Sequence, residues 1–190
     1  LRLLIEEPGI LANIPMFTPK TTISNITLKG KNGRYATIKG PFDQMSITAE
    51  ATLSSASVVY PPDTDNLLKL ASGLRAATKS SDTEPAPLPF NLDVTINLGE
   101  NVKYVTYPAN ISLNPGGFLH LLYDGMTFKV EEARFTSERG TIDIFGTVFQ
   151  ADNVDILMVD SQNLFSVDGT FFKRAPDGTL ITLKAVTSND

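Results

Sequence analysis

The chain has 190 residues, a formal net charge of −5 at pH 7 and a sequence pI near 4.9. An acidic chain without clustered Lys and Arg is a poor partner for a nucleic-acid backbone, so we expect no nucleic-acid binding. The absence of cysteine excludes disulfides, thiolate zinc sites and a cysteine nucleophile, while the length is sufficient for one domain with its own hydrophobic core.

The N-terminal third predicts short strands separated by turns. Residues 1–20 mix short apolar pieces with several prolines and predict no regular element. Thr22–Leu28 has the composition of a strand, Gly30–Gly33 that of a turn, and Tyr35–Ile38 could be the returning strand of a hairpin. Residues 45–53 alternate strictly between apolar and polar side chains, which predicts a strand with one buried face.

Residues 61–89 interrupt the strand pattern. Apolar residues recur at helical spacing from Leu67 to Ala77, which predicts one short amphipathic helix over residues 64–79. The following segment, Ser80–Pro89, is rich in proline and reads as an irregular linker. We therefore expect residues 61–89 to form a helix-plus-linker insertion in a β-rich chain.

From Phe90 onward the alternating pattern resumes and continues to Ala185. Short apolar and polar alternations are separated by turn residues, and Asp124-Gly125 and Asp177-Gly178 are strong signals for hairpins. Such spacing is typical of antiparallel neighbours. The sequence thus predicts an all-β fold with one short helix, organised as a single β-rich domain over residues 1–190. The chain starts without a leader and reads as a fragment of a larger protein.

Few residues suit catalysis or metal binding. His120 is the only histidine, and a lone histidine on a strand is more often a residue of the polar face than a catalyst. The pair Glu131-Glu132 places its carboxylates on opposite faces of a strand. Asp152-Asn153-x-Asp155 is too short for a calcium loop and reads as turn residues. Without phosphate-binding or nucleophile-elbow motifs, we expect a protein that is not an enzyme and uses no cofactor or metal.

A series of features between residues 88 and 186 carries a family resemblance. These features are Leu88–Val94, Asn101–Tyr104, Phe128–Val130, Arg139-Gly140, Thr141-Ile142, Gly146, Phe149, Val154–Ile156 and Asp177–Leu183. In this order they resemble the C-terminal region of the TamB translocation and assembly module family (AsmA-like, bridge-like lipid transport proteins), whose members are envelope proteins of diderm bacteria. The sequence departs from that pattern at Asp152-Asn153, where a glycine is common, and the segment 61–89 has no counterpart.

The resemblance implies a fold, a location and a role. The fold is a curved, mostly antiparallel sheet that forms an open trough, a β-taco, with an apolar concave face. The location is the periplasm, within an inner-membrane-anchored protein whose neighbouring modules continue the trough. The role is phospholipid transport between the inner and outer membranes. Alternatively, such a module assists assembly or secretion of outer-membrane β-barrel proteins, with an outer-membrane barrel of the assembly-factor family as partner.

On this interpretation the apolar residues of the alternating strands line a hydrophobic groove for phospholipid acyl chains. The candidate lining residues are Phe90, Leu92, Val94, Ile96, Ile142, Ile144, Val154, Ile156, Met158, Ile181 and Leu183. A chain of about 15 methylenes exposed to water costs roughly 12 kcal/mol, which such a groove would largely remove. Periodicity alone favours a closed core built from the same residues, and the resemblance favours the groove.

Three hypotheses remain open from the sequence. The chain is a lipid conduit module, a module that offers sheet edges to nascent barrel strands, or a generic ligand-binding β-domain. The helix at 64–79 is interpreted as a plug at the end of the trough, as a packing element of a closed core, or as an interfacial helix. The last role is the least favoured because the helix carries few cations.

Overall fold

The computed structural model of the chain describes residues 1–12, 24–31, 35–41, 44–59, 90–125, 127–162 and 164–187. The helix expected at 64–79 and its linker lie outside these residues. Within the described ranges the regular structure consists of strands and one 3-10 turn at Asp160–Gln162, with no α-helix. The prediction of an all-β fold is confirmed.

All described strands belong to one sheet. They are β1 (Arg2–Leu3), β2 (Ile5–Ala12), β3 (Ser24–Lys29), β4 (Ala36–Lys39), β5 (Met45–Ser54), β6 (Ser57–Val58), β7 (Phe90–Leu98), β8 (Val102–Thr106), β9 (Ala109–Leu113), β10 (Phe118–Tyr123), β11 (Phe128–Ser137), β12 (Arg139–Ile144), β13 (Thr147–Val159), β14 (Leu164–Arg174) and β15 (Leu180–Ala185). The pairs β5–β7 and β6–β8 are parallel and the others antiparallel, which agrees with the predicted, mostly antiparallel sheet.

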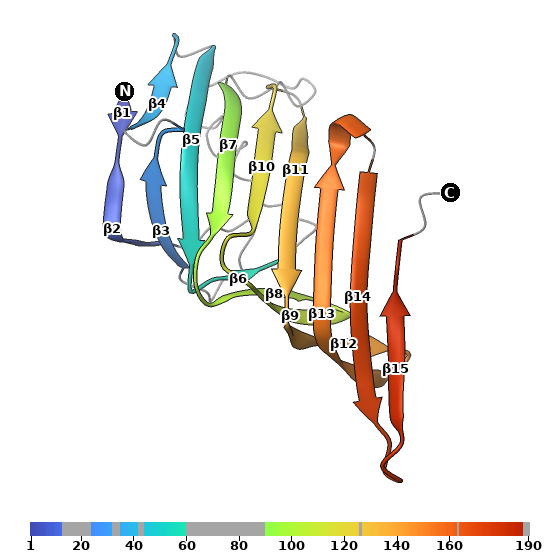
Figure 1. Cartoon of the computed structure of the whole chain (residues 1–190). Coiled ribbons are helices and arrows are strands. Elements are labelled where there is room, and N and C mark those ends of the chain that lie inside the picture. Colours follow the sequence, from blue (N-terminus) through green and yellow to red (C-terminus); the bar gives the residue numbers. More distant parts are fainter. Residues whose placement is uncertain are drawn as a thin grey trace, which may run out of the picture.

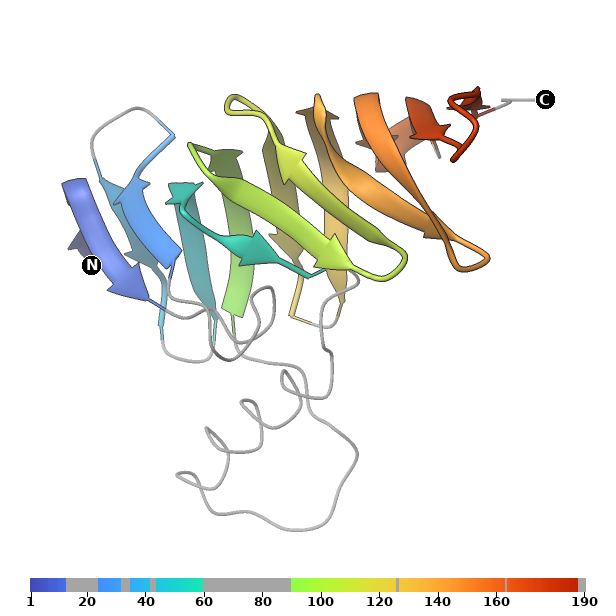
Figure 2. The same cartoon turned by 90° about the horizontal axis from the view of Figure 1, so that it is seen from below.

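The sheet has two arms that meet at a corner (Figures 1 and 2). In the main arm, β3 and β4 are followed by β5, β7, β10, β11, β13, β14 and β15, whereas β6, β8, β9 and β12 form a side arm across the strand ends. Within the described ranges, the chain passes from one arm to the other between β5 and β6, between β7 and β8, between β9 and β10 and between β11 and β12. The sheet does not close on itself. An open trough with a concave apolar face stays a prediction.

The long strand β13 joins the two arms. Residues 147–151 pair with β12 in the side arm, and residues 154–159 pair with β11 in the main arm. The other edge of β13 pairs with β14 from Gln150 to Val159. The sequence-based reading of Asp152-Asn153 as turn residues is therefore wrong, because both residues lie inside this strand.

The hairpin expected from Thr22–Leu28 and Tyr35–Ile38 is also wrong. The described residues Ser24–Lys29 and Ala36–Lys39 form strands, but β3 and β4 pair with the same edge of β5 and not with each other. β4 pairs with residues 46–48 and β3 with residues 50–54. Because β5 is long, it offers hydrogen-bonding positions to two short strands in succession.

The N-terminal segment forms two strands that the sequence does not predict. β1 pairs with β4, and β2 pairs with β3 at both of its ends. The ladder between β2 and β3 is interrupted between Ile5 and Ile10, where Pro8 and Gly9 lie. Proline lacks the N–H that a ladder needs, so its tolerance here agrees with an edge strand that contains an irregularity.

The corner between the two arms holds one of the two buried hydrophobic clusters that the described residues form. Leu53, Leu98 and Val102 are buried there together with Ala56, Ile111 and Leu113, and Val102 has no exposed surface. Leu53 lies one residue before the end of β5 and Leu98 ends β7, whereas Val102 starts β8 of the side arm. The bend therefore brings strand ends of both arms into one apolar cluster.

Candidate functional site

The strand register places all predicted groove-lining residues on one side of the sheet. Directly paired residues of neighbouring strands share a face, and faces alternate along each strand. One such row runs from Ala51 through Ile96, Leu119 and Ala133 to Met158. We call this side the apolar face, defined by the eleven predicted lining residues together with Leu119, Leu121, Ala133, Phe135, Phe149, Ala151 and Phe171.

The apolar face continues from the main arm into the side arm and to the last strand. Ile156 pairs with Phe135 on one side and with Val167 on the other. In the side arm Ile142 pairs with Phe149, and at the C-terminal end Phe171 pairs with Leu183. Side chains contributed by β7, β12, β13 and β15, distant in sequence, therefore belong to one continuous surface.

Most predicted lining residues are neither fully buried nor fully exposed to solvent. Val154 is 2% exposed and belongs to the core, whereas Ile181 on the edge strand β15 is 42% exposed. The other nine have intermediate exposure. A face covered throughout by a second layer would be buried at most positions, which is not the pattern of these residues.

The lining residues gather in two groups. Ile142, Ile144, Ile156 and Leu183 pack against a buried cluster formed by Phe149, Ala151, Val154 and Phe171. On β7, Ile96 packs against the corner core, and the Phe90 ring lies 5.2 Å from the ring centroid of Tyr123. The structure thus assembles a C-terminal group across β12–β15 and a second group along β7.

Sequence reasoning named Val154 but missed the other buried members of the C-terminal cluster. Phe149, Ala151 and Phe171 are 7%, 5% and 5% exposed. The alternation of Thr147, Phe149 and Ala151 with polar or exposed residues could have revealed two of them. Phe171 and Phe172 are adjacent, so periodicity alone cannot say which one faces the core.

The opposite side of the sheet carries ion pairs, and we call it the ion-pair face. The Lys31 ammonium lies 2.7 Å from an Asp93 carboxylate oxygen, which also lies 2.7 Å from His120 Nε2. His120 Nδ1 lies 2.8 Å from Glu131. Leu122, Leu157 and other apolar residues share this face by register. The expectation that His120 lies on a polar face is confirmed.

The charge of Asp93 is stabilised by this network. Partial burial raises its pKa, but hydrogen bonds and charge interactions from Lys31 and His120 outweigh burial and hold the pKa below its ordinary value of 3.8. His120 contacts both carboxylates, Asp93 through Nε2 and Glu131 through Nδ1. These contacts connect β7, β10 and β11 on the face opposite the predicted groove.

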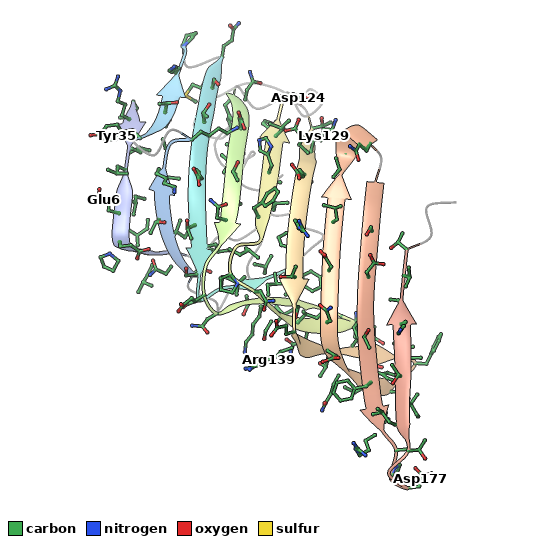
Figure 3. All side chains as sticks on the ribbon, viewed as in Figure 1. Glu6, Tyr35, Asp124, Lys129, Arg139 and Asp177 are labelled. Carbon is green, nitrogen blue, oxygen red and sulfur yellow. The ribbon has the colours of Figure 1, made fainter. Side chains whose placement is uncertain are left out.

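Other polar side chains mark the two ends of the main-arm strands. Figure 3 shows Asp124 and Lys129 at one end and Arg139 toward the other, with Asp177 at the far tip of the β14–β15 hairpin. Lys129 forms an ion pair with Asp160, and Arg134 Nη2 lies 3.7 Å from Asp155 on the ion-pair face. These pairs are largely exposed, which gives them a small share in stability.

Two shallow hollows lie at the side arm, with volumes of about 460 Å³ and 520 Å³. Both are lined mainly by polar residues, and they share Lys103, Ser112, Glu138 and Arg139. Neither hollow includes a predicted groove-lining residue. The two hollows lie in a mainly polar region of the side arm, and Ala151 is the residue of the apolar face that lines one of them.

The described residues hold no group of three or more His, Asp or Glu arranged to bind a metal ion. In the same part of the chain, no helix is long and apolar enough to cross a lipid bilayer. Comparison of the chain with protein-family models, curated proteins and solved structures gives no match. The TamB resemblance therefore stays a prediction.

Proposed function

We propose that this chain is a non-enzymatic module of the bacterial envelope, related to the TamB family, that offers its apolar face to phospholipid acyl chains. In this proposal it works in the periplasm of a diderm bacterium, as part of an inner-membrane-anchored protein. Neighbouring modules continue the path of the lipid between the inner and outer membranes.

The observation that carries the proposal is the continuity of the apolar face. Residues from β7 to β15 share one side of a single sheet, and most of them are partly exposed. Soluble proteins rarely leave a long contiguous apolar surface accessible without a ligand or partner for it. An acyl chain fits such a surface because it is long, narrow and apolar and needs no polar recognition.

The distribution of charge supports the same proposal. The lining residues lie on one face, whereas the Lys31–Asp93–His120–Glu131 network lies on the other. Burying an unpaired charge beside an acyl chain would be costly, and this separation keeps the network away from the lipid. Lys173, which pairs with Ile181 on the edge strand β15, is a charged residue on the apolar face. The ion-pair face can remain in water while the apolar face holds lipid.

The test uses two neighbouring residues of β13 that point to opposite faces. Ile156→Glu places a charge on the apolar face, and Leu157→Glu places the same charge on the ion-pair face opposite Arg134. The purified protein should release bound phospholipid in native mass spectrometry, and this lipid should be lost in Ile156→Glu but retained in Leu157→Glu. Ile181→Glu is a second apolar-face variant at an exposed position that tolerates charge.

Thermal unfolding separates loss of lipid from loss of fold. Ile156 packs against the C-terminal cluster, so its variant loses some stability, whereas Ile181 is 42% exposed and its variant should melt near the parent. If native mass spectrometry of the wild-type protein under gentle ionisation detects no bound phospholipid, the proposal is contradicted. Lipid that remains bound in both apolar-face variants contradicts it as well.

The edge strand β15 favours a second candidate function, interaction with strands of outer-membrane barrel proteins. β15 pairs only with β14 among the described strands, which leaves the other edge of Leu180–Ala185 open. Such an edge can pair with an added strand. Thr182→Pro and Leu183→Pro remove backbone N–H groups that point to opposite edges. The substitution that removes an N–H from the ladder with β14 should lower the melting temperature, whereas the one at the open edge should keep the parental value. The latter variant should lose binding of a barrel-strand peptide, and unchanged binding would eliminate this candidate function.

A further inference from the structure

Two hairpin turns lie side by side at one end of the side arm. The β8–β9 turn contains Tyr107-Pro108, and the β12–β13 turn contains Phe145-Gly146. β9 and β12 pair directly, and the backbone N–H of Asp143 donates to the carbonyl oxygen of Pro108 at 2.8 Å. Figures 1 and 2 both show the two hairpins projecting next to each other.

Both turns present an aromatic side chain to solvent. Phe145 is fully exposed at 101%, Tyr107 is 80% exposed, and Val148, which follows the second turn, is 52% exposed. A fully exposed phenylalanine contributes nothing to the packing of its own chain. Together the three side chains form an apolar tip, which we call the hairpin tip.

The backbone at Phe145 gives an independent reason to regard this side chain as functional. Phe145 has φ +52° and Gly146 has φ +76°, the left-handed conformations that favour Asn-Gly in a tight hairpin. A bulky aromatic residue at such a position is strained, and here no internal contact compensates for the strain. Backbone strain of this kind concentrates at sites of interaction.

The chemistry of the hairpin tip fits the interface of a phospholipid bilayer. Residues 104–110 and 141–150 contain Asp143 as their only charged side chain, so the turns can leave water at little electrostatic cost. The apolar side chains stand on two narrow projections, which suits insertion between lipids better than a flat protein interface. Tyrosine is enriched at the boundary between headgroups and acyl chains. Phenylalanine is among the apolar side chains that interfacial segments bury there.

We propose that the hairpin tip docks the module onto a phospholipid membrane by inserting Phe145 and Tyr107 at the bilayer interface. Because the turns carry no cation, attachment depends on apolar insertion and changes little with the content of anionic lipid. Ile144 of the apolar face directly precedes Phe145, which places the hairpin tip next to that face in sequence. The inference goes beyond the proposed function, since docking does not require that the apolar face carries lipid.

The absence of tryptophan from the chain allows a direct reporter. Phe145→Trp should shift its fluorescence emission to shorter wavelength when phosphatidylcholine vesicles are added to the full chain. The matched control is Leu11→Trp on β2, a position that is 75% exposed and lies at the other end of the sheet. Its emission should not shift. Identical spectra for Phe145→Trp with and without vesicles would overturn the proposal.

Vesicle sedimentation measures the contribution of Phe145 to binding. Phe145→Asn should weaken partitioning into phosphatidylcholine vesicles by about tenfold, the effect of removing one aromatic side chain from the interface. Asparagine adopts positive φ readily, so the fold is retained. The matched control Leu11→Asn should partition like the parent. Equal partitioning of Phe145→Asn and the parent would mean that the hairpin tip is not the docking element, even if lipid still co-purifies with the apolar face.

Discussion

Ala151 and Val154 lie three residues apart on β13, yet both belong to one buried cluster on the apolar face. In the ladder with β14, Ala151 pairs with Phe171 and Asn153 pairs with Thr170, so Asp152 is an extra residue on β13. This β-bulge shifts the alternation by one position. The side-arm half and the main-arm half of β13 can therefore contribute to the same face.

Deletion of Asp152 tests the role of this bulge. Without the extra residue, Phe149 and Ala151 would point away from the face that holds Val154 and Ile156. We expect a loss of roughly 4 kcal/mol or more in the free energy of unfolding, because buried apolar side chains would become exposed. Urea unfolding followed by circular dichroism measures the loss.

The control for the deletion is Asp152→Ala, which changes an exposed side chain and keeps the residue count. Its unfolding free energy should stay within about 0.5 kcal/mol of the parent. If the deletion variant is as stable as this control, the bulge does not determine which face the side chains of β13 point to.

Gly140 lies where two strands of the side arm approach closely. A Cβ atom at Gly140 would lie 2.7 Å from the carbonyl oxygen of Asn110 and 2.7 Å from the Cα of Ile111. Gly140→Ala should therefore push β9 away from β12 and cost about 1–3 kcal/mol of unfolding free energy. Gly146→Asn is the control, because no atom lies within 4 Å of a Cβ there and asparagine tolerates its positive φ. A neutral Gly140→Ala would contradict the steric argument.

The strands themselves are largely predictable from the sequence because alternation is a local signal. The alternating residues 45–53 form β5, and Asp124-Gly125 connects β10 to β11 as expected. The partners of these strands are less predictable. The parallel pairing of β5 with β7 joins segments on either side of residues 60–89, and no local pattern encodes such a contact.

The candidate site shows the same division between local and long-range information. Alternation identifies Ile142 and Ile144, or Val154 and Ile156, as residues that share a face within one strand. Only the register shows that β12 and β13 turn those residues to a common side. The bulge at Asp152 shifts the alternation by one residue, so a strict period of two assigns the wrong face on one side of it. The exposure of Phe145 results from the position of its turn in the fold, which the alternation pattern does not contain.

The corner core should dominate the stability of the junction between the arms. Val102 has no exposed surface and lies among Leu53, Leu98 and Ile111. We expect Val102→Ala to lower the unfolding free energy by about 2 kcal/mol through lost burial and a residual cavity. Val105→Ala removes the same atoms from a half-buried position on the same strand and should cost less than about 1 kcal/mol. Equal losses would show that the corner is not a tightly packed core.

The Asp93 network predicts a stability difference that depends on pH. Because the folded pKa of Asp93 is held below 3.8, the carboxylate stabilises the fold above the pKa that it has in the unfolded chain. This contribution is lost as the pH falls through the lower, folded pKa. Asp93→Asn should therefore destabilise the protein at pH 7, by less than about 1 kcal/mol because the Asp93 side chain is 39% exposed to solvent.

The measurement compares urea unfolding of Asp93→Asn and the parent at pH 7 and at several values below 3.8, where the difference should shrink toward zero. High salt should also reduce it at pH 7, since exposed ion pairs are screened. Glu138→Gln, at an exposed turn, is the control and should stay within about 0.5 kcal/mol of the parent at pH 7. A difference between Asp93→Asn and the parent that persists undiminished at the lowest pH would instead assign the effect to packing, because the protonated carboxyl and the amide are both neutral there.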